Sequence, residues 1–196
     1  MPSLGVAGPP SSVGDRVHDN AGTGLWTDCD NTATLYQDNT IVDNHGPGIH
    51  HEISCDAVIR GNTIARNGFK DPTGWVDGAG VLISSSPDVE IDHNLIDRNY
   101  NGISLRQDDR GTGLYCPRIV QNVKVHDNQV VMTRGSSGLS LTSGDTSWFT
   151  ARGNHFSGND YTLIDGTQRF AWMGQILDPS RWRAYGQDTD GTFRSG

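Results

Sequence analysis

The chain has 196 residues, which suits one ordinary domain or a fragment of a larger one. Its formal net charge of −8 argues against a nucleic-acid partner, because binding nucleic acid requires a basic face. No apolar run approaches the roughly 18 residues that cross a membrane, so no membrane partner is expected either.

The first sixteen residues match no repeat and lack the basic start and apolar stretch of a signal peptide. We interpret 1–16 as an irregular N-terminal segment or as the scar of a truncated longer chain. The first recognisable unit, VHDNAGTGLW, begins midway through a repeat. An uncapped N-terminal coil would expose strand edges, so self-association through it is expected.

Asparagine recurs before an apolar residue throughout the range 17–165. The units begin at Asn39, Asn62, Asn94 and Asn154, with a weaker copy at Asn128. A glycine followed by an apolar residue comes after each turn, in the segments 24–28, 48–52, 80–84, 102–106 and 138–142. A third short strand is expected before most units, within 33–37, 57–61, 89–93, 123–127 and 148–152. Three strands in each period of roughly 22–26 residues predict a solenoid.

Period-two alternation decides the type of solenoid. In each glycine-led strand, alternate residues are apolar and the residues between them are largely polar. This alternation predicts that one face of the strand is buried and the other is exposed to solvent. Equivalent strands then stack in parallel, about 4.8 Å apart. Asparagine suits the turns because it tolerates bent backbone, and its amide bonds the backbone and the asparagine of the next coil. An open β-sandwich of the same strands remains the alternative.

The Asn-x-apolar-x-x-Asn unit followed by Gly-Ile or Gly-Leu resembles the right-handed parallel β-helix repeat of the pectin-lyase-like superfamily. The resemblance covers roughly residues 17–165 and implies an all-β, single-stranded solenoid of about five to six coils. It also implies an extracellular or cell-surface location. The superfamily includes lyases, hydrolases, epimerases, phage tailspikes and adhesins, so its fold does not settle the function.

Residues 166–196 change character and are expected to cap the last coil. Asp178 followed by Pro179 predicts the start of a short helix that carries Trp182 and Tyr185. The tail is similar to the W…GQD ending of bacterial β-helix proteins.

Two insertions interrupt the coils, at 68–79 and at 107–121. Long loops on a solenoid usually line its binding face. Trp75 and Tyr115 lie on these loops, where they would stack on a sugar ring or simply anchor the loop.

Aligning the strands by their glycines gives two outward columns. The first is Trp26, His50, Leu82, Ser104 and Ser140, and the second is Asp28, Glu52, Ser84, Arg106 and Thr142. Asp28 and Glu52 would then lie on adjacent coils, close enough to share a proton or a cation. The candidate catalytic residues are Asp28, Glu52, Arg106 and His50, and the candidate substrate-binding residues are Trp26, Trp75, Tyr115 and Ser104.

The resemblance suggests two chemistries for this patch. In superfamily lyases, calcium or a basic residue neutralises a uronate carboxylate while an Arg or Lys removes the neighbouring proton. Here Asp28 and Glu52 would be the calcium ligands. Family hydrolases use clustered aspartates instead, and Asp108 and Asp109 offer such a pair, although they follow the strand rather than precede it.

Other interpretations compete with this one. Exposed Asp, Glu and Arg on a sheet are often only a solvated face. His51 falls on the inward parity and is expected to be a satisfied core histidine. The three cysteines, Cys29, Cys55 and Cys116, are odd in number and are expected to be buried thiols without a disulfide framework.

Three functions follow from these patterns. The first is a polysaccharide lyase or glycoside hydrolase whose groove runs along the glycine-led strands and binds a polysaccharide or oligosaccharide. The second is a non-catalytic structural or glycan-binding β-helix. The third is a truncated remnant of a larger enzyme.

Overall fold

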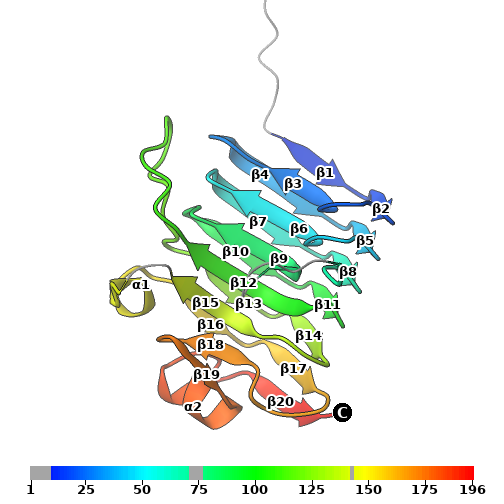
Figure 1. Cartoon of the computed structure of the whole chain (residues 1–196), viewed down its shortest axis with the longest axis vertical. Coiled ribbons are helices and arrows are strands. Elements are labelled where there is room, and N and C mark those ends of the chain that lie inside the picture. Colours follow the sequence, from blue (N-terminus) through cyan, green and yellow to red (C-terminus); the bar gives the residue numbers. More distant parts are fainter. Residues whose placement is uncertain (1–9, 71–76, 142–143) are drawn as a thin grey trace, which may run out of the picture.

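The computed structural model describes residues 10–70, 77–141 and 144–196. The chain winds into coils of three short strands, and equivalent strands stack into three sheets along one axis (Figure 1). Sheet A contains β1 (Ser11–Val13), β4 (Thr32–Gln37), β7 (Cys55–Arg60), β10 (Val89–Asp92), β13 (Lys124–His126) and β16 (His155–Ser157). Sheet B contains β2 (Arg16–His18), β5 (Thr40–Val42), β8 (Thr63–Ala65), β11 (Leu95–Asp97), β14 (Gln129–Met132), β17 (Asp160–Leu163) and β20 (Thr192–Ser195). Sheet C contains β3 (Leu25–Thr27), β6 (Ile49–Glu52), β9 (Ala79–Ser84), β12 (Asn101–Gln107), β15 (Ser137–Leu141), β18 (Phe170–Trp172) and β19 (Gln175–Leu177).

Neighbouring strands pair in parallel throughout, except that β18 and β19 form an antiparallel hairpin. The predicted parallel β-helix is therefore confirmed. Its coils begin at Ser11 and its last parallel strand in sheet C ends at Trp172. The inward parity of sheet C forms part of the core, as predicted, with Ile49, Val81 and Ile103 fully buried.

Two asparagine ladders hold the turns together. The first runs between sheets A and B through Asn39, Asn62, Asn94, Asn128 and Asn159. The second runs between sheets B and C through Asn20, Asn44, Asn67 and Asn99. Beyond the first member of each ladder, each side-chain oxygen accepts from the backbone N–H and the side-chain amide of the asparagine one coil earlier; Asn39, for example, donates to Asn62 over 3.0 and 2.9 Å. The role predicted for asparagine is therefore confirmed.

One predicted member of the ladder was wrong. Asn154 lies before β16 in sheet A, where its Oδ1 accepts from the backbone N–H of Val123. The ladder position of that coil belongs to Asn159, and Asn128 is a full member despite its weaker sequence match. The segment 154–159 (NHFSGN) therefore contributes its strand to sheet A, whereas the units that begin at Asn39, Asn62 and Asn94 contribute theirs to sheet B.

The strand predicted at 148–152 was also wrong. Ser147–Thr150 forms a short helix, α1, and sheet A is continued by β16 instead. Asp145 initiates the turn by accepting from the backbone N–H and the hydroxyl of Ser147. Trp148 is buried beneath the guanidinium of Arg152, which lies 4.4 Å from the ring centroid. The segment 148–152 (WFTAR) therefore anchors a turn and does not form a strand.

The tail closes the last coil, as expected. Helix α2 (Pro179–Ala184) begins after Asp178, whose side chain accepts from the Arg181 N–H at 2.9 Å. Trp182 is fully buried, and its indole N–H donates to Asp188. Asp188 also accepts from the backbone and the side chain of Asn159, so it ends the first asparagine ladder.

The N-terminal coil lies at the opposite end of the stack, where β1, β2 and β3 are the edge strands of the three sheets. Val13 on β1 is an exposed large apolar residue. The expected self-association through this coil stays a prediction.

The cysteine prediction was wrong. Cys55, at the start of β7, forms a disulfide with Cys116 on the second insertion, and the exposed Cys29 is outside it. The two bonded cysteines are 61 residues apart, and their approach depends on the path of the insertion. The spacing of the cysteines in the sequence does not indicate that these two form a disulfide.

Candidate functional site

The predicted columns on sheet C form, with one shift in register. His50 pairs with Trp26 on one side and Leu82 on the other, and Ser104 follows on β12. In the second column Glu52 pairs with Ser84, and Ser84 with Arg106. These pairings confirm the predicted order from β3 to β12.

The alignment fails at the last strand. Ser104 pairs with Gly138, and Arg106 with Ser140, so β15 is displaced by two residues from the predicted alignment on glycine. Gly138 lies against β18 at φ +136°, where an added Cβ would be 2.1 Å from the Ala171 carbonyl oxygen. Thr142 lies outside the described residues.

The outward face of sheet C was predicted to be exposed to solvent, but most of its side chains on β6, β9 and β12 are buried. Ser84 and Ser104 are 0% and 1% exposed, and Glu52 is also buried. Ser104 therefore offers no surface to a ligand. Only Trp26, at 60% exposed on the first coil, presents a large aromatic surface to solvent from this column.

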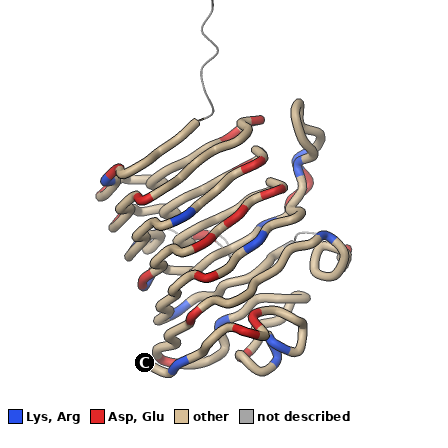
Figure 2. The backbone as a smooth tube through the Cα atoms, turned by 180° about the vertical axis from the view of Figure 1, so that it is seen from behind, with Lys and Arg blue, Asp and Glu red and all other residues tan. Residues whose placement is uncertain are grey.

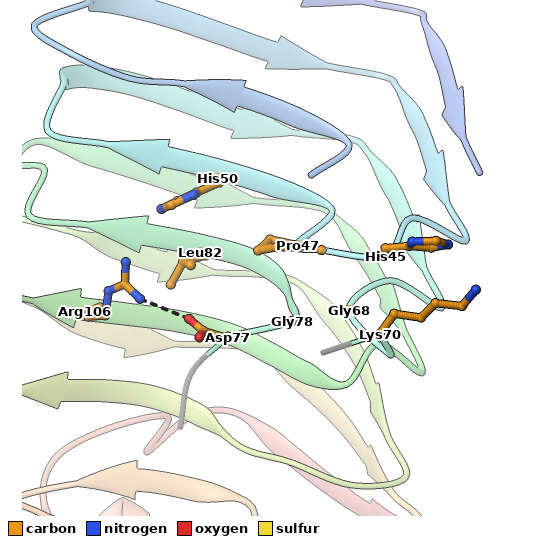
Figure 3. A pocket seen from close by; sticks show the side chains of 10 residues that line it. His45, Pro47, His50, Gly68, Lys70, Asp77, Gly78, Leu82 and Arg106 are labelled. Atoms are coloured by element: carbon orange, nitrogen blue, oxygen red, sulfur yellow. Dashed lines mark hydrogen bonds and ion pairs between the residues drawn. The ribbon is translucent and has the colours of Figure 1, made fainter. Parts of the chain in front are cut away.

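A pocket of about 200 Å³ opens over β6, β9 and β12. Its lining includes His50, Leu82 and Arg106 from the sheet, Asp77 from the first insertion, and His45 and Lys70 from the turn side (Figure 3). His50, Leu82 and Arg106 come from three successive coils. The stack thus brings residues that are 56 positions apart in sequence to one concave surface (106 minus 50).

Arg106 is held between two carboxylates. Its Nη1 donates to Asp77 Oδ1 at 3.0 Å, and its Nε lies 3.0 Å from Asp108 Oδ2. Asp77 reaches this face from the first insertion, and Asp108 positions the guanidinium from the end of β12. The two pairs fix an arginine that lines the pocket.

The second insertion supplies a residue that the sequence interpretation missed. Arg110 donates from Nη1 to Glu52 Oε1, although the two are 58 positions apart. Burial alone would raise the pKa of Glu52, but the hydrogen bond and the positive charge of the Arg110 guanidinium outweigh it, so the pKa of Glu52 is lowered. Glu52 is therefore a paired carboxylate anion at neutral pH.

His50 is kept neutral. Burial lowers its pKa to about 4, and the negative charge of Glu52 opposes this only in part. Nε2 lies 2.9 Å from Ser84 Oγ and 3.8 Å from Glu52 Oε2. We assign the imidazole proton to Nε2, because the Glu52 carboxylate lies on that side and the Ser84 hydroxyl can accept a hydrogen bond. In this tautomer Nδ1 carries the lone pair, and no hydrogen bond among the described residues engages it.

Trp26 extends the site toward the N-terminal coil. Its ring stacks on the His50 imidazole with centroids 5.8 Å apart and planes only 4° from parallel. An exposed indole in this place gives a flat platform beside the pocket.

Asp28 lies just past the end of β3, on the first coil. Its Oδ1 is buried without a hydrogen-bond partner in the described part of the chain. Its charge acts on His50 and Arg110, but it makes no ion pair with either among the described residues.

The carboxylates do not fit a calcium site. Within 10–70, 77–141 and 144–196, no three His, Cys, Asp or Glu side chains gather so that they could hold a metal ion. Ca²⁺ requires six to eight oxygen ligands, whereas Glu52 is already paired with Arg110.

The comparisons agree with this architecture. The family model described as "Right handed beta helix region" matches residues 13–171, which is most of the chain. The chain belongs to the right-handed β-helix family. No curated protein and no solved structure matches it.

Family membership explains the frame of the site and not its chemistry, because right-handed β-helices present different side chains on the same sheet.

Of the other sequence candidates, Tyr115 is 69% exposed on the second insertion, and Trp75 lies outside the described residues. None of the described helices is long and apolar enough to cross a membrane.

The first insertion has a narrow base beside this pocket. Gly68 and Gly78 approach so closely that a Cβ on Gly68 would lie 2.0 Å from the Gly78 carbonyl oxygen. Both glycines have positive φ, at +84° and +71°. A side chain at either position would push apart the two ends of the loop that carries Lys70 and Asp77.

Proposed function

We propose that this right-handed β-helix protein acts on an extended acidic glycan and cleaves it by β-elimination, as a polysaccharide lyase. The observation that carries the proposal is the neutral His50 in a pocket beside the fixed cation of Arg106. Each coil offers one step along a polymer, which suits a substrate longer than the pocket itself.

The proposed reaction uses the two groups in complementary ways. Arg106 binds the carboxylate of a uronate residue through the guanidinium N–H groups that Asp77 and Asp108 leave unengaged, and it stabilises the negative charge that develops on that carboxylate. His50 Nδ1 takes the proton from the carbon next to that carboxylate. The electron pair left behind forms the C4–C5 double bond while the C4–O bond breaks, and the leaving oxygen takes a proton from solvent. Glu52 and Arg110 position the imidazole without touching substrate.

Hydrolysis is the weaker alternative on this face. A glycoside hydrolase needs a carboxylic acid that stays protonated until it donates, and such a group has a raised pKa. Glu52 is the carboxyl group nearest to His50 on β6, and its pKa moves in the opposite direction because Arg110 holds it as an anion.

Non-catalytic glycan binding is the second candidate. It is favoured by the exposed rings of Trp26 and Tyr115, which would stack on sugars whether or not a bond is cleaved. It predicts saturable binding of the polymer without any product.

The Cys55–Cys116 disulfide supports an extracellular or cell-surface location, since disulfides persist mainly in oxidising compartments. This placement is part of the proposal.

The decisive assay incubates the purified chain with a panel of uronate polymers and follows the absorbance of the unsaturated product, with and without calcium. Loss of a general base typically costs about 10²- to 10⁴-fold, so we expect His50→Ala to lower the rate at least about 100-fold. His93→Ala, a change at an exposed turn on sheet A, is the matched control and should leave the rate unchanged. Full activity in His50→Ala would overturn the mechanism, and new reducing ends without unsaturated product would indicate hydrolysis.

A further inference from the structure

A second and larger pocket, of about 570 Å³, lies at the turn where the strands of sheet B end. We call it the turn pocket; it is lined by Asp19, Asp43, Asn44, His45, Arg66, Phe69, Lys70, Arg98, Thr133 and Arg134. It shares His45 and Lys70 with the pocket at His50, so the two hollows adjoin. Figure 3 shows His45 and Lys70 on the turn side, away from His50 and Arg106.

The charge of the turn pocket changes sign along the stack. Four equivalent strand-end positions, each with positive φ and each followed by an asparagine of the second ladder, are occupied by Asp19, Asp43, Arg66 and Arg98. The first two coils therefore contribute carboxylates and the next two contribute guanidinium groups. Arg134 follows β14 on the coil after that.

Two of the four cations in the turn pocket are already paired with carboxylates. Arg66 is held by Asp43 through bonds of 2.8 and 2.7 Å, and Arg98 pairs with its neighbour Asp97 at 3.1 Å. Lys70 and Arg134, in contrast, make no ion pair with any described residue. They are the groups most available to an incoming anion.

An aromatic ring sets the position of Arg134. Its guanidinium lies 5.5 Å from the centroid of Phe69, and Phe69 packs edge-on against Tyr100 at 5.9 Å. Phe69 itself is 44% exposed. A cation fixed on a ring beside an open apolar surface combines the two contacts that an acidic sugar offers, its carboxylate and its apolar ring face.

The charge of the whole molecule makes this arrangement unusual. The formal net charge is −8, and Figure 2 shows Asp and Glu recurring at the turns of successive coils. Four Lys or Arg side chains against two carboxylates in one hollow therefore form a local positive field on an acidic protein. Such a field would capture an anionic polymer that the rest of the surface repels.

We propose that the turn pocket binds a second uronate residue of the glycan, with Lys70 and Arg134 contacting its carboxylate. The ligand class rests on the proposed function, whereas the site itself is argued from its own charges. The glycan would then cross the turn between sheets B and C on its way to the pocket at His50.

The test measures binding of a uronate oligosaccharide by isothermal titration calorimetry, in a His50→Ala background so that the ligand stays intact. Lys70→Met with Arg134→Ala removes the two available cations. The matched control is Lys124→Met with Arg152→Ala, which removes the same charge from sheet A and from a second cation–ring pair. A neutral oligosaccharide of equal length measures the contribution of the sugar rings alone.

We expect the turn-pocket variant to weaken uronate binding about tenfold or more, and the control to change it less than about twofold. The difference should shrink as salt is added, and neutral-sugar binding should not respond. Equal losses in both variants would mean that net charge alone attracts the ligand, and unchanged binding in the turn-pocket variant would equally overturn the proposal.

These outcomes are distinguishable from failure of the proposed function. Product formation in the unaltered chain together with an unaffected turn-pocket variant would reject only the turn-pocket site. Loss of binding in that variant, with no product from any polymer, would retain the anion site and reject the lyase.

Discussion

Two adjacent histidines on β6 show how one strand separates a site from a core. His50 points to the pocket, whereas the fully buried His51 points inward, with Nδ1 3.4 Å from the Tyr36 hydroxyl. Burial lowers the pKa of His51 to about 4, and repulsion from His50 adds to this effect only once His50 is itself protonated. His51 was predicted as a satisfied core histidine; its burial is confirmed, but its Nε2 has no hydrogen-bond partner within the described ranges.

The buried histidine predicts acid sensitivity. The unfolded chain binds the His51 proton near its ordinary pKa of 6.5, whereas the folded chain binds it only near 4. The stabilisation from the neutral imidazole is therefore complete above about pH 6.5 and is lost as the pH falls toward 4. One pKa unit corresponds to about 1.4 kcal/mol, so His51 alone should lower the free energy of unfolding by about 2 kcal/mol at pH 5.

Denaturant unfolding at a series of pH values between 7.5 and 4.5 measures this slope. His51→Phe should flatten it, and His155→Phe at an exposed site should not. A slope that is the same in His51→Phe and in the unaltered chain would show that other groups carry the acid sensitivity.

At the scale of the element, the second insertion acts as a strap. It leaves β12 and rises toward the N-terminal coils, as the green segment beside the stack shows in Figure 1. Asp30 on the first coil accepts from the Leu114 N–H at 2.9 Å and from Arg118 at 3.0 Å, and the disulfide ties Cys116 to Cys55. The strap thereby holds Arg110 over Glu52, which in turn positions His50.

The strap predicts a redox dependence. Reduction, or Cys55→Ser with Cys116→Ser, should expose Arg110 and Arg118 to trypsin and lower the stability by about 4 kcal/mol, as the entropy model gives for a closed loop of this length. Cys29→Ser should behave like the unaltered oxidised chain, because Cys29 is not in the disulfide.

Limited proteolysis with mass spectrometry locates the cleavage sites, and thermal unfolding supplies the stability. If reduction leaves both the cleavage pattern and the midpoint of unfolding unchanged, the disulfide does not hold the strap. Cleavage confined to arginines outside the second insertion would likewise show that the strap stays in place without the disulfide.

For the whole molecule, the solenoid could be predicted because its determinants are local and repeated. Asn39, Asn62 and Asn94 each occupy the same turn, and the spacing between them reports the coil directly. The columns through His50 and through Glu52 followed from the same periodicity. The tail helix was predictable from Asp178 and Pro179, whose roles are confined to one turn of backbone.

The remainder depended on contacts that periodicity does not encode. Arg110 reaches Glu52, and Cys116 reaches Cys55, only because an irregular loop folds back over earlier coils. The alignment of the sheet C strands by their glycines was wrong at β15. Gly138 accommodates the close approach of β18 and does not mark the start of a strand. The fold could thus be predicted from the sequence, whereas the ion pair between Arg110 and Glu52 at the site could not.

The neutrality of His50 is the physical state on which the proposed chemistry rests, and it can be measured without any substrate. A ¹⁵N NMR titration of the imidazole reports both its pKa and its tautomer. We predict that His50 remains neutral down to about pH 4, with its proton on Nε2 and a lone pair on Nδ1. Titration near the ordinary value of 6.5, or a proton on Nδ1 at neutral pH, would contradict the proposed mechanism.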